Sequence, residues 1–494
     1  MAVKELTVFM VCFWIVYSAA GHEFFSSTDQ IAQLYGKTKD FLKVFSQCID
    51  ADNVETMKSV LLNLLLSYSD SENPEEAMRN PVAAYRLLRQ MRNDLIFIEK
   101  HIKPNLYQCE EYQDELDAKL LEIPQLEDVD GAASGLIRLQ EIYKLHPEDI
   151  TKETSLNADE AYHVGLVAYD EGKFQHAFLW FLDSLDRLTE YSTTTEEELL
   201  HYLSSSAYHF GSLPVAIYFG QQLLNLVINI FAPDPSNDEV RVQLNWLLHL
   251  QSNPDIFTLN TESSNYEALC RGEVDERTSK RQRALSCRYS TGGGNPRLMY
   301  APVKEEVEWD EPRIIRYHDI ISDREIEILK NISRPQLSRS QIGKGTVSDF
   351  RTSQSVFLKE DYTVARINQR IADITGLSIE SSEYLHVQNY GIGGRYEPHY
   401  DAWDNENERI ATFLIYMSDV EIGGTTVFPK VGVALQPEKG SAVFWYNLHK
   451  SGTVDLKTEH AGCPVLMGNK WVANKWIHEY GQVFRRPCSL SDRE

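Results

Sequence analysis

The stretch YEPHYDAW, residues 396–403, places a histidine and an aspartate two positions apart among aromatic residues. On an α-helix, residues i and i+2 point about 200° apart and cannot share a ligand. On a β-strand, side chains alternate between the two faces, so His399 and Asp401 emerge on the same side. The spacing therefore predicts a strand that presents both side chains to one site.

A metal site at this position needs a third protein ligand. The downstream histidines are His449, His460 and His478. Two histidines and one carboxylate are the ligands of non-haem Fe(II) oxygenases, which keep further coordination positions open. A zinc hydrolase uses the same ligand types, but its helical HExxH signature is absent from the sequence. The pattern favours an Fe(II) site and leaves the choice of the second histidine open.

Short apolar segments, many of them bounded by glycine, follow one another from about Leu298 onward. They are YLHVQNY (384–390), ATFLIYMS (411–418), TTVFP (425–429), SAVFWYN (441–447) and NKWVANKWIHEY (469–480). Many short strands at this spacing predict a β-sandwich or barrel. Lys470 and Trp476 share strand parity, so both can face its interior, where a lysine requires an anion as its partner.

Residues 155–250 contain an internal repeat. Ala168, Tyr169, Gly172 and Ala177 recur 39 positions later as Ala207, Tyr208, Gly211 and Ala216. The pattern resembles tetratricopeptide repeats, lengthened by the polar insert YSTTTEEE (191–198) and closed by the helix DEVRVQLNWLLHL (238–250). Such a helical solenoid binds extended peptide on its concave face. The tyrosines expected either to line this groove or to pack between helices are Tyr162, Tyr169, Tyr202 and Tyr208.

The first twenty residues have the layout of a cleaved secretory signal. Lys4 precedes the apolar run 8–17, and small residues follow at 18–21. The run is too short to span a membrane, and no later segment reaches about 18 uninterrupted apolar residues. We therefore expect a secreted or ER-lumenal protein without a membrane span.

The region after the signal is predicted to be helical. The segment LLRQMRNDLIFIEKHI (87–102) spaces its apolar residues alternately by three and four positions. These residues are Leu88, Met91, Leu95, Ile98 and Ile102. The spacing is that of a short coiled-coil seam, and it is equally that of a bundle helix facing its own core.

Six of the seven cysteines follow the predicted signal. An even number in an oxidising compartment predicts disulfides. Sequence proximity favours Cys48–Cys109, Cys270–Cys287 and Cys463–Cys488. The second of these would close a basic loop (270–287), after which STGGGNP (290–296) forms a flexible joint. The only glycosylation sequon begins at Asn331.

The bulk composition restricts the class of protein. A chain of 494 residues with 43% hydrophobic and 24% charged residues is a multidomain globular protein. Its formal net charge of -25 argues against nucleic acid as a partner, because binding to phosphates requires a basic surface.

Three segments closely resemble the catalytic domain of collagen prolyl 4-hydroxylase α subunits. They are QNYGIGGRYEPHYD (388–401), RIATFLIYMSDVEIGGTTVFP (409–429) and the glycine- and aromatic-rich segment 440–476. The resemblance extends over the repeat and the 270–287 loop, and thus over nearly the whole secreted chain. It implies a multidomain α + β protein. The expected order is a signal peptide (1–20), a helical, coiled-coil dimerisation region (21–138), a tetratricopeptide-like peptide-binding domain (139–250), a disulfide-closed linker (251–297) and a double-stranded β-helix (jelly-roll) catalytic domain (298–494).

The resemblance also assigns roles to single residues. His399, Asp401 and His460 correspond to the Fe(II) ligands, and His449 stands where relatives commonly have an aromatic residue. Lys470 corresponds to the residue that binds the distal carboxylate of 2-oxoglutarate, helped by the hydroxyls of Tyr390 and Thr426. Trp476 corresponds to an aromatic residue beside the catalytic centre, and Arg409 to an arginine near the substrate proline. The entrance loop 402–408 is shorter than in vertebrate relatives.

The implied reaction is hydroxylation of proline in X-Pro-Gly sequences of procollagen, with Fe(II), 2-oxoglutarate, O2 and L-ascorbate, and with release of succinate and CO2. One alternative is a hydroxylase of another residue such as lysine. Lysyl hydroxylases generally have arginine where this chain has Lys470. Another alternative is a catalytically silent peptide-binding scaffold of the ER, in which a cluster of buried charges would be costly to retain.

The resemblance further implies a partner. The sequence ends in SLSDRE (489–494), which is not a KDEL-type retention signal. Members of the family assemble with protein disulfide isomerase, which carries one, in an α2β2 tetramer. We therefore expect this chain in the lumen of the endoplasmic reticulum, retained through its partner.

Overall fold

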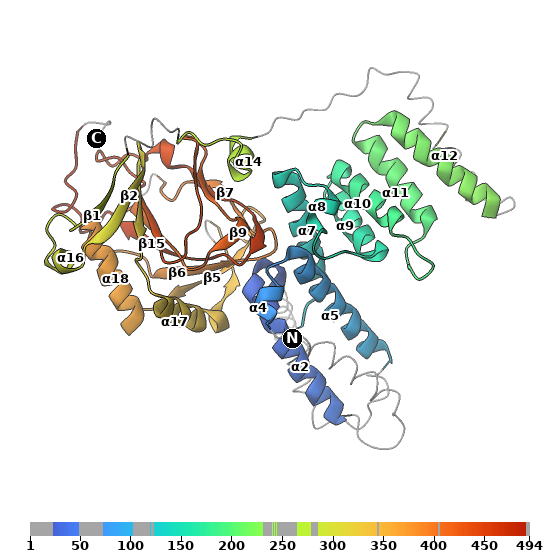
Figure 1. Ribbon diagram of the computed structural model, residues 1–494, viewed down its shortest axis with the longest axis horizontal. Helices are drawn as coiled ribbons and strands as arrows, with labels where there is room; N and C mark the ends of the chain where they lie inside the picture. The colour runs from blue at the N-terminus through green and yellow to red at the C-terminus, as the bar shows by residue number, and fades with distance from the viewer. Residues whose placement is uncertain are drawn as a thin grey trace, which may run out of the picture.

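A computed structural model describes most of the chain as a helical N-terminal part, a helical repeat and a β-sheet domain (Figure 1). The described residues are 23–48, 73–101, 123–230, 264–277, 285–342, 345–403 and 406–490, with a few isolated positions between them. The predicted signal peptide lies outside them. Within the described ranges, no helix is long and apolar enough to cross a membrane.

The N-terminal part is a small helical bundle. Its elements are η1 (Phe24–Ser26), α2 (Thr28–Cys48), α4 (Pro74–Ala77), α5 (Pro81–His101), α7 (Leu126–Tyr143) and α8 (Pro147–Ile150). One end of the bundle lies next to the β-sheet domain, and α2 and α5 extend away from that domain (Figure 1). The apolar face of α5, including Leu88, Met91 and Leu95, is buried in one core with Phe41 and Leu42 of α2. This face therefore packs within its own chain, as in the bundle interpretation. Ile102 lies outside the described residues, and dimerisation through this region stays a prediction.

Four helices form the predicted repeat: α9 (Ala158–Asp170), α10 (Phe174–Asp186), α11 (Glu196–His209) and α12 (Leu213–Ile230). Each pair turns at a glycine with positive φ, 74° at Gly172 and 87° at Gly211. Equivalent hydrogen bonds close both turns. The amide of Lys173 donates to the carbonyl oxygen of Ala168 in the first copy, and the amide of Ser212 donates to that of Ala207 in the second. All four alanines of the motif are fully buried between helices. The repeat is therefore confirmed, while most of the closing helix 238–250 lies outside the described residues.

The β-sheet domain contains all the strands of the described part of the chain. They are β1 (Cys287–Ser290), β2 (Val303–Asp310), β3 (Arg313–His318), β4 (Ser338–Arg339), β5 (Ser353–Leu358), β6 (Leu385–Tyr390), β7 (Tyr396–His399), β8 (Arg409–Tyr416), β9 (Val420–Gly423), β10 (Thr426–Phe428), β11 (Val433–Leu435), β12 (Ala442–Tyr446), β13 (His460–Gly462), β14 (Val465–Gly468) and β15 (Trp471–His478). Its helical elements are α14 (Asn265–Cys270), α16 (Pro296–Tyr300), α17 (Asp323–Ser333), η5 (Arg334–Gln336), α18 (Tyr362–Thr375) and η6 (Leu456–Thr458). The five segments that the sequence predicts as strands match β6, β8, β10, β12 and β15.

The strands form antiparallel sheets that face one another. A nine-stranded sheet has the order β1-β2-β3-β12-β8-β15-β6-β5-β4, and a four-stranded sheet has the order β11-β10-β13-β7. One face of the large sheet packs on α17 and α18, and its other face packs on the small sheet. Alternation along β15 shows the two faces, since Trp471 and Ala473 face the helices while Val472 faces the small sheet. This agrees with the fold class expected from the sequence.

The cysteine pairing differs from the prediction. Cys270 forms a disulfide with Cys463, although 193 residues separate them. Helix α14 packs beside β10 and β13 in a small apolar cluster, and this brings the two Cα atoms to 5.5 Å. The pairs Cys270–Cys287 and Cys463–Cys488 are therefore wrong, because sequence proximity ignores this tertiary contact; Cys287 and Cys488 are exposed and free. The pair Cys48–Cys109 falls outside the described side chains.

The region predicted as linker is attached to the catalytic domain. Strand β1 pairs with β2 at the edge of the large sheet, so the sheet begins at Cys287. Asn295, in the expected flexible joint, donates from Nδ2 to Asp373 Oδ1 at 3.1 Å and begins α16. The sequon residue Asn331 is exposed on α17, where its Oδ1 accepts from Arg334 at 3.0 Å. Its glycosylation stays a prediction.

Candidate metal centre

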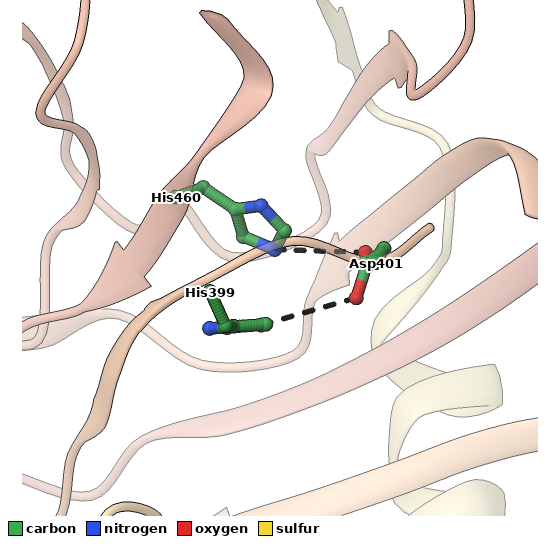
Figure 2. Close-up of side chains that lie close together, drawn as sticks. All are labelled: His399, Asp401 and His460. Carbon is green, nitrogen blue, oxygen red and sulfur yellow. Dashed lines mark ion pairs between the residues drawn. The ribbon is translucent and has the colours of Figure 1, made fainter. Parts of the chain in front are cut away.

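Two adjacent strands and a short extension bring the predicted ligands together (Figure 2). His399 ends β7 and lies directly opposite His460, the first residue of β13, in the antiparallel ladder. Asp401 follows β7, and its two oxygens lie 3.8 Å from His399 Nε2 and 3.5 Å from His460 Nε2. One ligand atom from each residue lies within 4.8 Å of the others. Within the described ranges, no other group of histidines, cysteines and carboxylates has this geometry.

Backbone carbonyls orient both imidazole rings. The Nδ1 atom of His399 lies 2.7 Å from the carbonyl oxygen of Glu397, and that of His460 lies 3.0 Å from the carbonyl oxygen of Thr458. A carbonyl only accepts, so each Nδ1 carries the proton and donates it. The Nε2 lone pairs are therefore free and point toward Asp401, which is the tautomer that a metal ion requires.

The protonation states also suit a metal ion. Asp401 is buried, and although burial alone would raise its pKa, His460, His399 and Arg409 hold that pKa at about 2. Burial, followed by the nearby His460, lowers the pKa of His399 to about 3. At neutral pH the carboxylate is charged and His399 is neutral, so neither has to lose a proton to bind a cation.

A second layer of polar groups holds the carboxylate. Thr412 donates from Oγ1 to Asp401 Oδ2 at 2.7 Å, and Asn447 donates from Nδ2 to the same threonine oxygen at 3.0 Å. Such outer partners orient a ligand and are as characteristic of a metal site as the ligands themselves. The sequence pattern did not identify Thr412, on β8, or Asn447, directly after β12, because both lie outside the segment that carries the ligand motif.

The remaining histidines lie elsewhere. His449 Nε2 lies 3.7 Å from Asp455 Oδ1 beside a surface groove, and its side chain is 31% exposed. His478 bonds through Nδ1 to the carbonyl of Asn407 at 2.6 Å and lies 3.2 Å from Glu383 Oε1. The antiparallel pairing therefore selects His460 from the three histidines that the sequence leaves open.

A buried lysine lies in the same pocket as the two ligand histidines. The pocket is lined by Gln388, Tyr390, Tyr396, His399, Leu414, Thr426, Trp445, His460, Ala461, Gly462, Lys470, Val472 and Asn474. Lys470 is 2% exposed, and its Nζ lies 4.9 Å from the centroid of the Tyr390 ring. Burial lowers its pKa to about 7. Because no described side chain forms an ion pair with it, the pocket favours an anionic ligand at this end.

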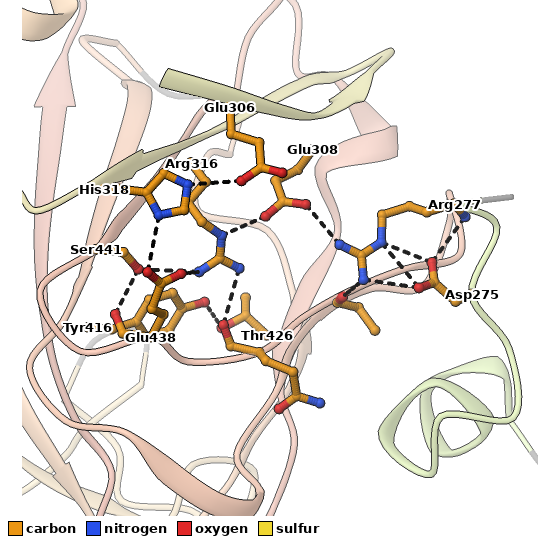
Figure 3. A network of polar contacts seen from close by, with 12 residues as sticks. Asp275, Arg277, Glu306, Glu308, Arg316, His318, Tyr416, Thr426, Glu438 and Ser441 are labelled. Atoms are coloured by element: carbon orange, nitrogen blue, oxygen red, sulfur yellow. Dashed lines mark hydrogen bonds and ion pairs between the residues drawn. The ribbon is translucent and has the colours of Figure 1, made fainter. Parts of the chain in front are cut away.

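Thr426 is held by a polar network that extends as far as Arg277 (Figure 3). Tyr416 donates from its hydroxyl to Thr426 Oγ1 at 2.8 Å, and the guanidinium carbon of Arg316 lies 5.9 Å from the centroid of the Tyr416 ring. Arg316 in turn donates to Glu308, which accepts from Arg277 of the linker at 2.8 Å. Because Thr426 Oγ1 already accepts this bond, its own proton remains available for an acceptor in the pocket.

Arg409 and Trp476 form one wall beside the triad. The guanidinium carbon of Arg409 lies 3.9 Å from the centroid of a Trp476 ring, and Arg409 Nε donates to Glu383 Oε1 at 2.6 Å. The sequence pattern did not identify Glu383, although His478, which shares strand parity with Trp476, contacts the same carboxylate. It also missed Tyr396, whose ring stacks on His399 at 3.5 Å between centroids.

Three of the four predicted groove tyrosines form a ladder between α9 and α11. The Tyr202 ring lies 5.9 Å from that of Tyr162 and 5.3 Å from that of Tyr169, both with edge-to-face geometry. All three are half-buried, and the Tyr169 hydroxyl lies 2.7 Å from Ser205 Oγ. Tyr208 packs against the cluster between α11 and α12.

Three families of known proteins match the helical N-terminal part, the helical repeat and the β-sheet domain of this chain. Residues 27–156 match the family "Prolyl 4-Hydroxylase alpha-subunit, N-terminal region", residues 158–245 the "Prolyl 4-hydroxylase peptide-substrate-binding domain" and residues 385–478 the "2OG-Fe(II) oxygenase superfamily". The third match covers the triad and Lys470, and it supports Fe(II) and 2-oxoglutarate as the metal and the anionic ligand.

Prolyl 4-hydroxylase α subunits from several animals are similar to this chain over nearly the whole length of both proteins. Prolyl 4-hydroxylase subunit alpha-1 of Rattus norvegicus is 39% identical, covering 95% of this chain and 96% of its own. The alpha-1 subunit of Homo sapiens is 38% identical over 97% of each chain, and the alpha-2 subunit of Gallus gallus is 37% identical over 98% of each. A solved viral collagen prolyl hydroxylase from Paramecium Bursaria Chlorella virus-1 is 24% identical, covering 33% of this chain and 95% of its own, with a TM-score of 0.30.

The choice of His460 over His449 has a direct test. His460→Ala is expected to lower the affinity for Fe(II) by more than about 100-fold, the upper limit for loss of an outer partner. His449→Ala, which removes a histidine of the same domain outside the triad, should leave it unchanged. Iron content after anaerobic dialysis of the two variants measures the difference. Loss of iron from His449→Ala would contradict the assignment.

Proposed function

The chain belongs to the family of prolyl 4-hydroxylase α subunits, and we propose that it hydroxylates proline at C4 in X-Pro-Gly sequences of procollagen or collagen-like chains. One observation carries the proposal. A pocket joins the histidines of a His-Asp-His metal triad to a buried lysine that has no ion-pair partner among the described residues, and this combination suits Fe(II) at one end and a dicarboxylate at the other.

Each group in the pocket has a role in the proposed reaction. When bound, Fe(II) and 2-oxoglutarate together with O2 supply the oxidising chemistry, which yields succinate, CO2 and hydroxyproline. His399, Asp401 and His460 hold the metal through two Nε2 atoms and one carboxylate. Lys470 neutralises the distal carboxylate of 2-oxoglutarate, and the hydroxyls of Tyr390 and Thr426 donate to it.

The walls of the pocket favour productive turnover. Leu414, Trp445 and Val472 line it with apolar surface, which excludes water from the reacting centre. Arg409 and Trp476 lie beside the triad and form the wall against which the substrate proline would lie. Arg409 is held in place by Glu383, so its guanidinium is already oriented before peptide binds.

The tyrosine ladder supports a second, distant contact with the substrate. Unhydroxylated procollagen is rich in polyproline II structure, whose proline rings pack well on aromatic surfaces. A groove that includes Tyr162, Tyr169 and Tyr202 would hold a repetitive chain and raise its effective concentration at the metal. The contribution of Tyr208 to this groove stays a prediction.

The cellular setting is part of the proposal. Family resemblance supports protein disulfide isomerase as the partner in an α2β2 tetramer, retention in the lumen of the endoplasmic reticulum through that partner, and L-ascorbate as the reductant that restores oxidised iron. The predicted signal peptide and disulfides suit that compartment.

The decisive experiment measures succinate release by the full chain co-expressed with disulfide isomerase, given Fe(II), 2-oxoglutarate, ascorbate and a (Pro-Pro-Gly) repeat peptide. We expect peptide-dependent turnover, one added oxygen on prolines by mass spectrometry, and a loss of more than about 100-fold in Lys470→Ala, because a buried carboxylate would lack its counter-ion.

Two results would redirect the assignment. Oxygen added to lysine in a lysine-containing peptide would indicate a hydroxylase of another residue. Absence of turnover with any peptide, in protein that still holds iron, would favour the peptide-binding scaffold.

The binding of 2-oxoglutarate should depend on pH through Lys470. Its pKa in the free site is lowered to about 7 by burial, so its ammonium charge is present below that pH and is lost as the pH rises through it. Because the carboxylate pairs with the charged form, affinity should fall by up to about tenfold per pH unit above pH 7.

Calorimetric titration of 2-oxoglutarate from about pH 6 to about pH 8.5 measures this effect. Lys470→Arg is the matched control, since a guanidinium stays charged throughout that range. Equal slopes in the wild type and in this variant would show that Lys470 is not the titrating group.

The groove predicts a dependence on peptide length. Tyr169→Ala is expected to remove most of the decrease in KM between short and long (Pro-Pro-Gly) peptides, while kcat stays within about twofold, because aromatic stacking is lost at a site remote from the metal. Tyr191→Ala is the control, since Tyr191 is 86% exposed in the same domain and outside the ladder. Peptide-length profiles that coincide for all three proteins would exclude the ladder as a binding site.

A further inference from the structure

The first described residues of the chain lie on strand β6 of the catalytic domain (Figure 1). Thr28 donates from Oγ1 to the carbonyl oxygen of Tyr390 at 3.0 Å, and Ser27 donates from Oγ to Asn389 Oδ1 at 2.7 Å. The amide of Ile392 completes the contact by donating to the carbonyl oxygen of Phe25 at 3.1 Å. These bonds join residues more than 360 positions apart, and those made by Ser27 and Thr28 are fully buried.

Asn389 connects this segment to Lys470. Its Oδ1 accepts from Ser27 Oγ and from the amide of Asp29 at 3.1 Å, while its Nδ2 donates to the carbonyl oxygen of Lys470 at 3.1 Å. The same carbonyl accepts from the amide of Tyr390 at 3.1 Å. Asn389 is fully buried, and only one orientation of its amide suits two donors on one side and a carbonyl on the other. The N-terminal segment thus bonds directly to the backbone of Tyr390 through Thr28, and reaches the backbone of Lys470 through Asn389.

The loop after β6 needs this support because it is rich in glycine. Residues 391–394 read Gly-Ile-Gly-Gly and lead into β7, which carries His399. Glycine retains the most backbone freedom in a loop that nothing holds. In this chain, Phe25 of η1 holds one side of the loop by accepting the hydrogen bond from the amide of Ile392. On the other side, Arg138 of α7 is buried and donates to the carbonyl oxygen of Gly393 at 3.0 Å.

Close packing and ion pairs also stabilise the interface between the N-terminal helical part and the β-sheet domain. A Cβ atom on Gly135 of α7 would lie 2.5 Å from the carbonyl oxygen of Ile392, so the helix approaches the loop as closely as its backbone allows. Arg334 of the catalytic domain binds the buried carboxylate of Asp29 at 3.0 Å, and Arg339 binds Glu23 at 2.5 Å. The segment is therefore anchored at both ends by charge and in its centre by hydrogen bonds.

We propose that the segment Glu23–Asp29 is a structural part of the 2-oxoglutarate site, in which Ser27, Thr28 and Asn389 are positioning residues that hold the backbone of Tyr390 and Lys470. The inference rests on the proposed role of Lys470 as the carboxylate anchor. It gives the N-terminal helical region a role in catalysis within a single α chain, in addition to any role in subunit assembly.

The test separates the cosubstrate from the peptide. Thr28→Val keeps the shape of the side chain and removes its bond to Tyr390, and Ser27→Ala removes the bond to Asn389. In the full chain with its disulfide isomerase partner, each should raise the KM for 2-oxoglutarate about fivefold, the effect of one buried hydrogen bond. Both kcat and the KM for peptide should stay within about twofold. Thr28→Ser restores the hydroxyl and should restore the wild-type value.

A second measurement does not depend on turnover. Binding of oxalylglycine, a non-reacting analogue of 2-oxoglutarate, should weaken by the same factor in Thr28→Val and Ser27→Ala. Hydrogen exchange in the ligand-free chain should accelerate at the amides of Tyr390 and Ile392, which donate to Lys470 and Phe25. Both effects are expected even if hydroxylation of the chosen peptide is not observed, so failure of the proposed function and failure of this inference are distinguishable.

Ser184→Ala is the matched control. Ser184 is fully buried and donates from Oγ to the carbonyl oxygen of Ala158 at 2.8 Å, but it lies in the helical repeat. The Ser184→Ala variant should lose about as much folding stability as Thr28→Val and Ser27→Ala. It should show no change in the KM for 2-oxoglutarate, in the affinity for oxalylglycine or in the hydrogen exchange of residues 389–392. The proposal is overturned if Thr28→Val and Ser27→Ala behave like this control, or if they reduce kcat and both KM values together, as general destabilisation would.

Discussion

The register between β7 and β13 is the constraint on which the site depends. His399 faces His460 across an antiparallel pair, and Asp401 reaches both only because the chain leaves β7 immediately after His399. A slip of one residue would turn a ligand toward the other face of the sheet. Pairing of β13 with β10 holds the register from the far side, and Phe428 of β10 packs in the core between the two sheets. The metal site is therefore a product of strand pairing.

The buried charges around the pocket differ in whether the protein supplies their partner. Arg409 has a protein partner in Glu383, and Asp401 has Thr412 together with the two histidines. Lys470 alone among these buried charges has no acidic partner in the described part of the chain, and burial lowers its pKa as a result. A protein core does not retain an unpaired ammonium without a reason, because its desolvation is uncompensated. The free energy lost in the empty pocket is recovered when a carboxylate binds, which makes the site selective for anions of suitable length.

Strand periodicity predicted that His399 and Asp401 share a site and that Lys470 faces the interior. The two ligands do share a site, but β7 ends at His399, so Asp401 reaches it through the bend that follows the strand and not through alternation along one strand. The choice between His449 and His460 was not decidable from spacing, since it depends on which strands pair. Thr412, Glu383 and Asn389 were not identified for the same reason, because each contacts a residue that only the folded chain brings beside it. The disulfide prediction failed because α14 folds onto β10 and β13, a contact that proximity along the chain does not contain.

The division into modules, which family similarity draws at residues 156 and 385, does not coincide with the physical unit of the site. Support for the pocket comes from both sides of these limits. Arg277 of the linker reaches the Arg316 network through Glu308, and Ser27 reaches Lys470 through Asn389. Each connection passes through a buried polar residue, Glu308 or Asn389, that would lose a hydrogen-bond partner without the distant residue, and a buried polar group left without a partner costs more than the bond contributes. The catalytic sheet therefore carries polar groups whose complements lie in other regions of the chain, and the site is complete only in the assembled α subunit.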